Sequence, residues 1–247
     1  MKVDGQAAIV TGGASGLGRE TAAQLLDAGA RVAVFDLNTG ELPGAFFVPC
    51  DVSNSASASD AIAAAREKHG PARILVNCAG IAPAKRIVGR EGPMALEEFT
   101  RVVQVNLIGT FNMLRLAAGD MVKLDPLDDG ERGVIVSTAS VAAYEGQIGQ
   151  AAYAASKGGV ASLTLPAARE LAQFGVRVLA IAPGVFMTPL IEGLPLEVQQ
   201  SLAASIPFPK RLGAPSEFAA LVRHCIENRY LNGEVIRLDG ATRLAAR

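Results

Sequence analysis

Three residues in the second half of the chain have the types and spacing needed to move a proton to and from an alcohol oxygen. Ser140 precedes Tyr153 by thirteen residues, and Lys157 follows Tyr153 by four. On a helix, a spacing of four places the phenol and the ammonium on one face, about one turn apart. A cation about 5 Å from a phenol, at an effective dielectric of about 20, favours the phenolate by about 3 kcal/mol, or about two pKa units. The spacing therefore predicts a general acid–base pair, although a surface helix with an incidental Tyr/Lys pair has the same pattern.

A glycine-rich turn near the N-terminus predicts a dinucleotide site. Gly12, Gly16 and Gly18 lie where an apolar run should turn into a helix. Glycines permit a tight turn and close backbone approach, and the free N–H groups of the helix can hold a pyrophosphate. The next apolar run ends at Asp36, whose carboxylate can accept hydrogen bonds from ribose hydroxyls and would repel a 2′-phosphate. The sequence therefore favours NAD over NADP, with a simple turn aspartate as the alternative for Asp36.

Apolar runs alternate with helical patterns along nearly the whole chain. Near-continuous apolar runs are typical of parallel strands buried on both faces, and strand–helix alternation is typical of a doubly wound sheet. We therefore predict an α/β fold: one Rossmann-type domain, residues 1–247, with about seven parallel strands and helices on both faces. The expected strands are residues 7–10, 31–35, 45–48, 74–76, 134–137, 177–182 and 234–238, and the expected helices are residues 18–28, 55–69, 96–121, 151–173 and 216–228.

Two of the loops that interrupt this alternation are candidates for substrate contacts. The proline-rich residues 185–209 follow a strand at the edge where ligands bind in open α/β sheets, so we expect a substrate-binding lid there. An earlier loop carries Lys85, Arg86 and Arg90, which could reach a coenzyme A phosphate or belong to a solvated surface.

Composition narrows the class of protein. Of 247 residues, half are hydrophobic and 19% are charged, and the formal net charge is −1. That balance gives no electrostatic reason to expect a nucleic acid or a membrane as partner. The three widely spaced cysteines, Cys50, Cys78 and Cys225, indicate reduced core residues, and no metal site is expected. The first apolar run begins by Ala7 and leaves no room for a targeting peptide, so we expect a cytoplasmic protein.

Taken together, the motifs resemble the classical short-chain dehydrogenase/reductases over essentially the whole chain. The resemblance rests on residues 11–18, Asp51-Val52, residues 77–80, Asn106, Ser140, Tyr153, Lys157 and Pro183-Gly184. Within that family the chain is most similar to the type-2 3-hydroxyacyl-CoA dehydrogenases. That narrower resemblance rests on residues 133–171, with Pro166 in mid-helix, on residues 207–213 and on residues 232–241.

The resemblance implies roles for individual residues. Tyr153 would be the general acid/base, Lys157 would bind the nicotinamide ribose and lower the tyrosine pKa, and Ser140 would hold the substrate oxygen. Asn106 would hold a water that links Lys157 to bulk solvent. Gln150, just before the tyrosine, could face the substrate together with Ser140 and Tyr153. The implied cofactor contacts are Gly12, Ser15, Gly16, Leu17, Gly18, Asp36, Asp51, Val52, Asn77, Cys78, Ala79, Gly80, Tyr153, Lys157, Pro183, Gly184, Phe186 and Thr188.

The activity that the resemblance implies is an NAD-dependent oxidoreductase of fatty acid metabolism. Its small-molecule substrate would be a secondary alcohol or ketone, most closely the (3S)-3-hydroxyacyl-CoA/3-oxoacyl-CoA pair. A hydroxysteroid or a 3-oxoacyl carrier-protein thioester stays open as an alternative substrate. An NAD-binding scaffold subunit is the alternative of another class, which the intact Ser/Tyr/Lys/Asn set argues against. Family members are usually homotetramers through two long helices, here residues 96–121 and 151–173, so we expect a homotetramer.

Overall fold

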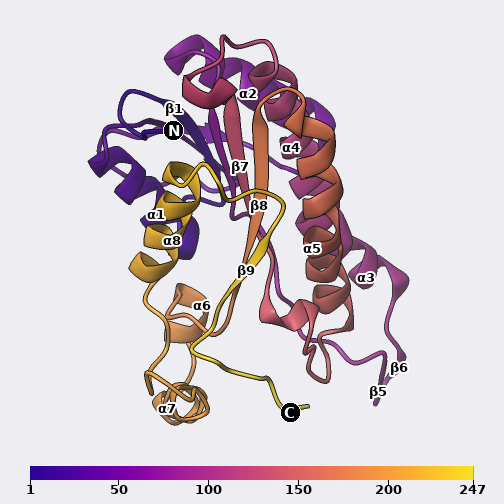
Figure 1. Ribbon diagram of the computed structural model, residues 1–247. Coiled ribbons are helices and arrows are strands. Elements are labelled where there is room, and N and C mark those ends of the chain that lie inside the picture. Colours follow the sequence, from indigo (N-terminus) through magenta and orange to yellow (C-terminus); the bar gives the residue numbers. More distant parts are fainter. Residues whose placement is uncertain (247) are drawn as a thin grey trace.

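A seven-stranded, all-parallel sheet forms the centre of the molecule, as the alternation of strand and helix patterns predicted (Figure 1). The computed structural model describes residues 1–246, with every side chain among them except that of Leu190. The sheet order is β3-β2-β1-β4-β7-β8-β9. The strands are β1 (Ala7–Thr11), β2 (Arg31–Asp36), β3 (Phe46–Pro49), β4 (Ile74–Asn77), β7 (Gly133–Thr138), β8 (Val176–Pro183) and β9 (Val235–Leu238).

Helices cover both faces of the sheet. In Figure 1, α1 and α8 lie on one face, and α2, α4 and α5 lie on the other. The helices are α1 (Gly16–Asp27), α2 (Ser55–His69), α3 (Leu96–Val103), α4 (Gly109–Met121), α5 (Ala151–Ala172), α6 (Pro189–Glu192), α7 (Leu196–Ala204) and α8 (Pro215–Glu227). None of the helices among residues 1–246 combines the length and the apolar character that crossing a membrane requires.

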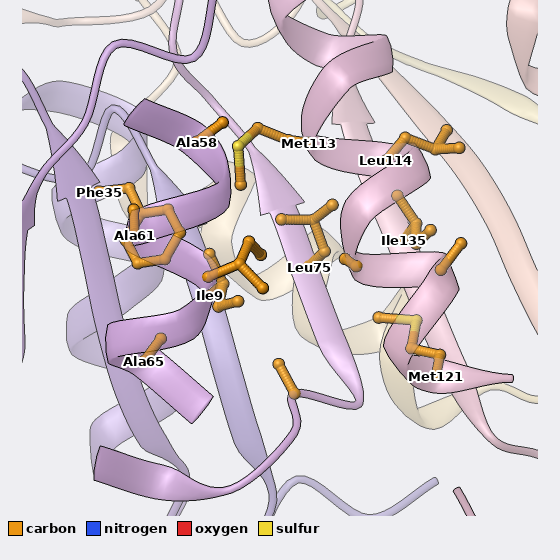
Figure 2. Close-up of a cluster of buried hydrophobic side chains, with 14 of the residues drawn as sticks. Ile9, Phe35, Ala58, Ala61, Ala65, Leu75, Met113, Leu114, Met121 and Ile135 are labelled. Atoms are coloured by element: carbon orange, nitrogen blue, oxygen red, sulfur yellow. The ribbon is translucent and has the colours of Figure 1, made fainter. Parts of the chain in front are cut away.

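Each face of the sheet has its own hydrophobic core because successive strand residues point to opposite faces. Ile9, Phe35 and Leu75 are buried against alanines of α2 and against Met113 of α4 (Figure 2). The adjacent residues on these strands, such as Val10, pack on the other face with α1 and α8. Burial on both faces explains why the strands read as continuous apolar runs.

Strand register brings a row of polar residues to one edge of the sheet. Thr11 of β1 lies opposite Asn77 of β4, and Asn77 lies opposite Ser137 of β7. The strand order reverses between β1 and β4, and in open α/β sheets such a point leaves a crevice outside the carboxyl ends of the strands. The sequence-predicted site residues follow these same strand ends.

Three features differ from the predicted elements. The expected helix at residues 96–121 contains a π-helical turn, Gln104–Ile108, between α3 and α4. The proline-rich segment contains the short helices α6 and α7, and the basic loop contains a small hairpin of β5 (Val88–Gly89) and β6 (Gly92–Pro93). π-turns often occur at functional sites, so the position of this one, around Asn106, bears on the site itself.

Candidate active site

The glycine loop between β1 and α1 is closely packed against neighbouring backbone. Gly12 has a φ of +66°, and its N–H donates to the carbonyl of Phe35 at 2.7 Å. A Cβ on Gly12 would lie 2.6 Å from the amide nitrogen of Ala79, and a Cβ on Gly18 would overlap the carbonyl oxygen of Gly12. These positions therefore accept only glycine, and the loop is shaped by backbone contacts rather than by side chains.

The start of α1 is open to an anion. Ser15 precedes the helix with extended backbone, and its side chain makes no capping hydrogen bond. The first N–H groups of a helix have no partner within it and carry the positive end of its dipole. Gly16, with a φ of +51°, begins the helix, and Leu17 packs partly into the core beneath it. This cradle fits the pyrophosphate of a dinucleotide.

Asp36 closes the glycine loop at the end of β2. Its Oδ2 accepts from the N–H of Ala14 at 3.1 Å, and its Oδ1 accepts from the N–H of Asn38 at 3.0 Å. An ionised carboxylate has about four acceptor positions, so these two bonds leave capacity for the hydroxyls of a ribose. The structure therefore places Asp36 beside the loop, where the sequence predicted it.

The loops after β3 and β4 complete the dinucleotide side of the crevice. Asp51 is held by Ser53, whose N–H and hydroxyl both donate to Asp51 Oδ1, at 2.9 and 2.6 Å. Val52 is buried, and a Cβ on Gly109 of α4 would lie 2.7 Å from it. The loop therefore fits tightly against α4, and glycine is required at the contact.

Residues 77–80 lie between the glycine loop and α5. The amides of Cys78 and Ala79 both donate to the Thr11 hydroxyl at 3.2 Å, and Asn77 Nδ2 donates to Ser137 Oγ at 3.2 Å. Burial raises the pKa of the Cys78 thiol to about 11, so this sulfur is a neutral group at the crevice rather than a nucleophile. Thr11 begins the glycine-rich run, but the sequence assigned it no role of its own, and only the fold shows that its hydroxyl holds residues 78 and 79.

The three predicted catalytic side chains converge from β7 and α5. Ser140 follows β7, and its Oγ accepts from the N–H of Ala142 at 3.1 Å as it caps the 3-10 helix Val141–Ala143. Tyr153 and Lys157 lie on the first turns of α5, with the Lys157 ammonium 5.9 Å from the centre of the Tyr153 ring. The Ser140 hydroxyl lies near enough to hydrogen-bond the phenol. Two hydroxyl groups side by side in this way can hydrogen-bond one alcohol oxygen.

Burial controls the protonation of both catalytic groups. It raises the pKa of Tyr153, and the hydrogen bond with Ser140 acts in the opposite direction. It also lowers the pKa of Lys157 to about 8. Burial therefore outweighs the lowering of the tyrosine pKa that was expected from Lys157, because a Coulomb estimate at 5 Å omits the lost hydration of both groups. The lysine pKa still lies above 7, so the ammonium form predominates at neutral pH.

Lys157 is positioned by the end of β7. Its Nζ donates to the main-chain carbonyl of Thr138 at 2.5 Å, and a Cβ on Gly80 would lie 3.7 Å from the same nitrogen. The ammonium thus lies at the meeting point of β4, β7 and α5. Thr138 is a second residue that sequence motifs do not identify, since it contributes only its backbone.

Asn106, fully buried in the π-turn, links that turn to the crevice. Its Oδ1 accepts from the N–H of Ile81 and its Nδ2 donates to the Ile81 carbonyl, both at 2.8 Å. Its Nδ2 also donates to Ser156 Oγ at 3.0 Å. The side chain therefore joins the loop after β4 to α5. The sequence missed this bridging role, because both partners are distant along the chain, and the expected water stays a prediction.

The segment after β8 contributes two of its predicted residues in different ways. The Phe186 side chain is 6% exposed and packs edge-on against Phe218 at 6.3 Å between ring centres, so it points into the core. A Cβ on Gly16 would lie 3.7 Å from the Thr188 methyl group, so this segment lies beside the glycine loop. Pro183 ends β8, and the Gly184 N–H donates to the Leu238 carbonyl at 2.9 Å.

Gln150 lies at the start of α5 beside a surface hollow of about 390 Å³. Its Oε1 accepts from the N–H of Gln147 at 3.0 Å. The hollow adjoins the Ser–Tyr–Lys group without including any of its members, and it is lined by Arg86, Ile87, Val88, Gly146, Gln147, Ile148, Gly149, Gln150, Ala151 and Ala154. Within residues 1–246, no three His, Cys, Asp or Glu side chains are grouped as a metal site would require.

Comparison with known proteins agrees with this geometry. Residues 6–198 match the sequence profile of the family described as short chain dehydrogenase. A 3-hydroxyacyl-CoA dehydrogenase type-2 from Bos taurus is 52% identical, over 98% of this chain and 97% of the bovine protein. An ipsdienol dehydrogenase from Ips pini is 33% identical, over 98% of this chain and 99% of that protein. The crystal structure of a 3-hydroxyacyl-CoA dehydrogenase type-2 from Mycobacterium avium matches with a TM-score of 0.91 and 43% identity, covering both chains completely.

Proposed function

Because the chain belongs to the short-chain dehydrogenase family, as its motifs predicted, we propose that it is an NAD-dependent 3-hydroxyacyl-CoA dehydrogenase. The reaction would interconvert (3S)-3-hydroxyacyl-CoA and 3-oxoacyl-CoA. The observation that carries the substrate class is the 52% identity, over 98% of this chain, to a protein named for that activity. The convergence of Ser140, Tyr153 and Lys157 at the end of β7 supports the reaction type.

The residues of the chain account for the proton chemistry of this reaction. The glycine loop and Asp36 would hold NAD, which would supply the hydride acceptor for the carbinol carbon. Tyr153 would accept the hydroxyl proton, and Ser140 would donate a hydrogen bond to the oxygen as its charge develops. The Lys157 ammonium would favour the phenolate, and a cationic ring placed beside it would lower the tyrosine pKa further. Lys157 would also bind the ribose next to that ring, and Asn106 would hold a water that leads from Lys157 to solvent.

An assay of NADH absorbance tests the substrate class directly. We expect turnover of acetoacetyl-CoA at a kcat/KM well above that of a steroid ketone or a carrier-protein thioester. Tyr153→Phe should abolish turnover while dinucleotide binding survives, because only the proton-transfer group is lost. A preference for one of the other substrates would replace the acyl-CoA assignment. Binding of NADH with no turnover of any of them would favour a scaffold subunit.

The cofactor preference is proposed from Asp36. Its carboxylate, fixed by the amides of Ala14 and Asn38, would accept bonds from the ribose hydroxyls and repel a 2′-phosphate. We expect kcat/KM to be higher with NAD than with NADP. Asp36→Ala should narrow that ratio by weakening NAD binding and by removing the repulsion. A wild-type preference for NADP would contradict the proposal.

Arg86 is the candidate for contact with coenzyme A. Lys85 is paired with Glu98 at 2.6 Å, whereas Arg86 lines the hollow at the start of α5. Arg86→Glu should raise KM for acetoacetyl-CoA by about tenfold or more. KM for a small β-keto ester should be unchanged, since that substrate lacks the phosphates of coenzyme A. Arg101→Glu, an equal charge reversal on exposed α3, is the control. An equal effect on both substrates would remove Arg86 from the coenzyme A site.

We also propose that the chain forms a homotetramer. Three apolar side chains are each more than 40% exposed where the family's interface helices would lie. They are Ile108 in the π-turn, Phe111 on α4 and Leu165 on α5. Light scattering should give the mass of four chains, and Phe111→Asp should lower that mass.

We also propose a lid. Residues 185–209, which include α6 and α7, would cover the acyl chain, because this segment lies beside the glycine loop at Thr188.

A further inference from the structure

The C-terminal segment of the chain is hydrogen-bonded to the loop that joins Ser140 to α5. We call residues 140–150 the catalytic loop and residues 237–246 the C-terminal segment; the latter is the yellow end of the chain in Figure 1. The N–H of Ile148 donates to the Ala246 carbonyl at 3.0 Å, and Gln147 Nε2 donates to the Ala245 carbonyl at 3.1 Å. These contacts join two parts of the chain that are about a hundred residues apart.

The Glu145 side chain is the main attachment point on the catalytic loop. Its carboxylate accepts from Arg237 Nη1 at 2.8 Å and Nη2 at 3.3 Å, and from the N–H of Leu244 at 3.0 Å. Arg243 Nε lies 3.3 Å from the same carboxylate. These donors hold the pKa of Glu145 below its usual range, with the Arg237 hydrogen bond as the largest cause. One carboxylate therefore gathers three groups of the C-terminal segment.

The ion pair is better shielded than the other paired arginines on the surface. The side chains of Glu145 and Arg237 are 20% and 24% exposed, compared with about half for the Arg223–Glu227 pair on α8. Arg237 is itself fixed, since Asp239 accepts from it at 2.7 Å and its guanidinium lies 5.5 Å from the ring centre of Tyr144. Charge-assisted bonds in such a network are stronger and more rigid than exposed pairs.

Short hydrogen bonds connect Glu145 to the reacting groups. The Glu145 N–H donates to the Val141 carbonyl at 3.0 Å, within the turn that Ser140 caps. On the other side, the N–H of Gln147 donates to Gln150 Oε1, and the Gln150 carbonyl accepts from the N–H of Ala154. Ala154 adjoins Tyr153 on α5. The attachment at Glu145 thus lies between the two side chains that must face the same substrate oxygen.

We propose that Glu145, through its pair with Arg237, is a positioning residue that fixes the catalytic loop so that Ser140 and Tyr153 share one substrate oxygen. The kinetic part of this inference rests on the proposed function. Misplacement of a reacting group by about 1 Å can cost about a hundredfold in rate. Loosening the loop should therefore lower kcat, while the dinucleotide side, built from the glycine loop and Asp36, should stay intact.

The test compares two variants that each neutralise one glutamate of an Arg–Glu pair. Glu145→Gln should lower kcat by about 10- to 100-fold and change the Kd for NADH less than twofold. Glu227→Gln, which breaks the Arg223 pair on α8, should change neither. In the double-mutant cycle, adding Arg237→Gln to Glu145→Gln should lower kcat little further, because the two residues act as a unit. Arg237→Lys, which keeps the charge, should give an intermediate kcat.

Hydrogen exchange supplies a readout that needs no turnover. Amides of residues 141–153 should exchange faster in Glu145→Gln than in the wild type, with no change in β1 and α1. Unchanged kcat and exchange would overturn the proposal, as would a loss of NADH affinity as large as the loss of kcat. Should Glu145→Gln fail to fold, Arg237→Lys carries the same measurements. Should the wild type turn over no substrate, the proposed function fails, and exchange alone decides whether Glu145 holds the loop.

Discussion

Lys157 is placed where an ammonium is unfavourable, and this is a consequence of what it would do. The side chain is 4% exposed, and burial lowers its pKa to about 8 from 10.5. Its Nζ donates a hydrogen bond to the carbonyl of Thr138. A charge that is kept in the site despite this cost can act on the phenol of Tyr153 and on a ribose. Functional groups commonly cost stability in this way.

The pH dependence of stability should reveal this cost. The folded protein binds the Lys157 proton less tightly than the unfolded chain, so wild-type stability should rise between about pH 8 and pH 10.5. Lys157→Met lacks this contribution, and near pH 7 it should unfold at a higher urea concentration. The gain should be at most about 3 kcal/mol, less the lost bond to Thr138, and it should shrink toward pH 10. Lys210→Met, at an exposed position, is the control. A difference that stays constant with pH would contradict this account.

At the scale of the element, the glycine loop and the start of α1 depend on backbone contacts that leave no room for a Cβ. Gly18→Ala would force the Gly12 carbonyl to move. We expect NADH affinity to fall by at least tenfold and the free energy of unfolding to fall by about 1–3 kcal/mol. Calorimetric titration and urea unfolding measure the two effects.

Gly119 of α4 gives a matched control for this substitution. Nothing lies within 4 Å of a Cβ built on it. Gly119→Ala should therefore keep NADH affinity and stabilise the protein by about 0.5–1 kcal/mol, since alanine loses less conformational freedom than glycine on entering a helix. Equal loss of affinity in both variants would show that the Gly18 contact is not what shapes the loop.

The elements that the sequence predicted well are those that read as continuous apolar runs or as long helical patterns. The apolar runs predicted β1 and β4 to within one residue, since these strands extend to Thr11 and Asn77, and helix α2 has the predicted bounds. The π-turn could not be read in this way, because it depends on Asn106 meeting Ile81 and Ser156 across the fold. Helices α6 and α7 were also missed, since they are short and their proline-rich sequence has no clear period.

The site was predictable in its members and less so in its contacts. Spacing placed Tyr153 and Lys157 one helical turn apart, and the glycine-rich turn and the other motifs distinguished them from an incidental pair. The inward direction of the Phe186 ring depends on Phe218, which lies more than thirty residues later. The effect of burial on the pKa of Tyr153 depends on how many elements close around it, which local sequence does not record.

At the scale of the whole molecule, the candidate active site and a buried network that stabilises the fold lie at opposite ends of the sheet. The candidate active site follows the carboxyl ends of β1, β4, β7 and β8. Near the amino ends of β7 and β8, Arg177 forms a buried network that ties β8 to the end of α8. Its guanidinium pairs with Glu131 at 2.8 Å. It also donates to the main-chain carbonyls of Cys225, Ile226, Asn228 and Leu231, at 2.8 to 3.2 Å.

Arg177→Met should lower the free energy of unfolding and leave kcat unchanged, because it alters only the end of the sheet that lies away from the candidate active site. It would leave four carbonyls without this donor and Glu131, 5% exposed, with only its contacts to the Met1 ammonium and Arg229. Breaking a buried pair from one side typically costs about 3–5 kcal/mol, a large part of the stability of a domain. Urea unfolding should show that loss, whereas Arg223→Met, in a half-exposed pair, should lose less than about 1 kcal/mol.

Below its unfolding transition, Arg177→Met should keep wild-type kcat, because β8 separates the network from Tyr153 by its full length. A stability loss below 1 kcal/mol would show that other contacts hold α8 to the sheet, and a fall in kcat without one would show that the two ends are coupled.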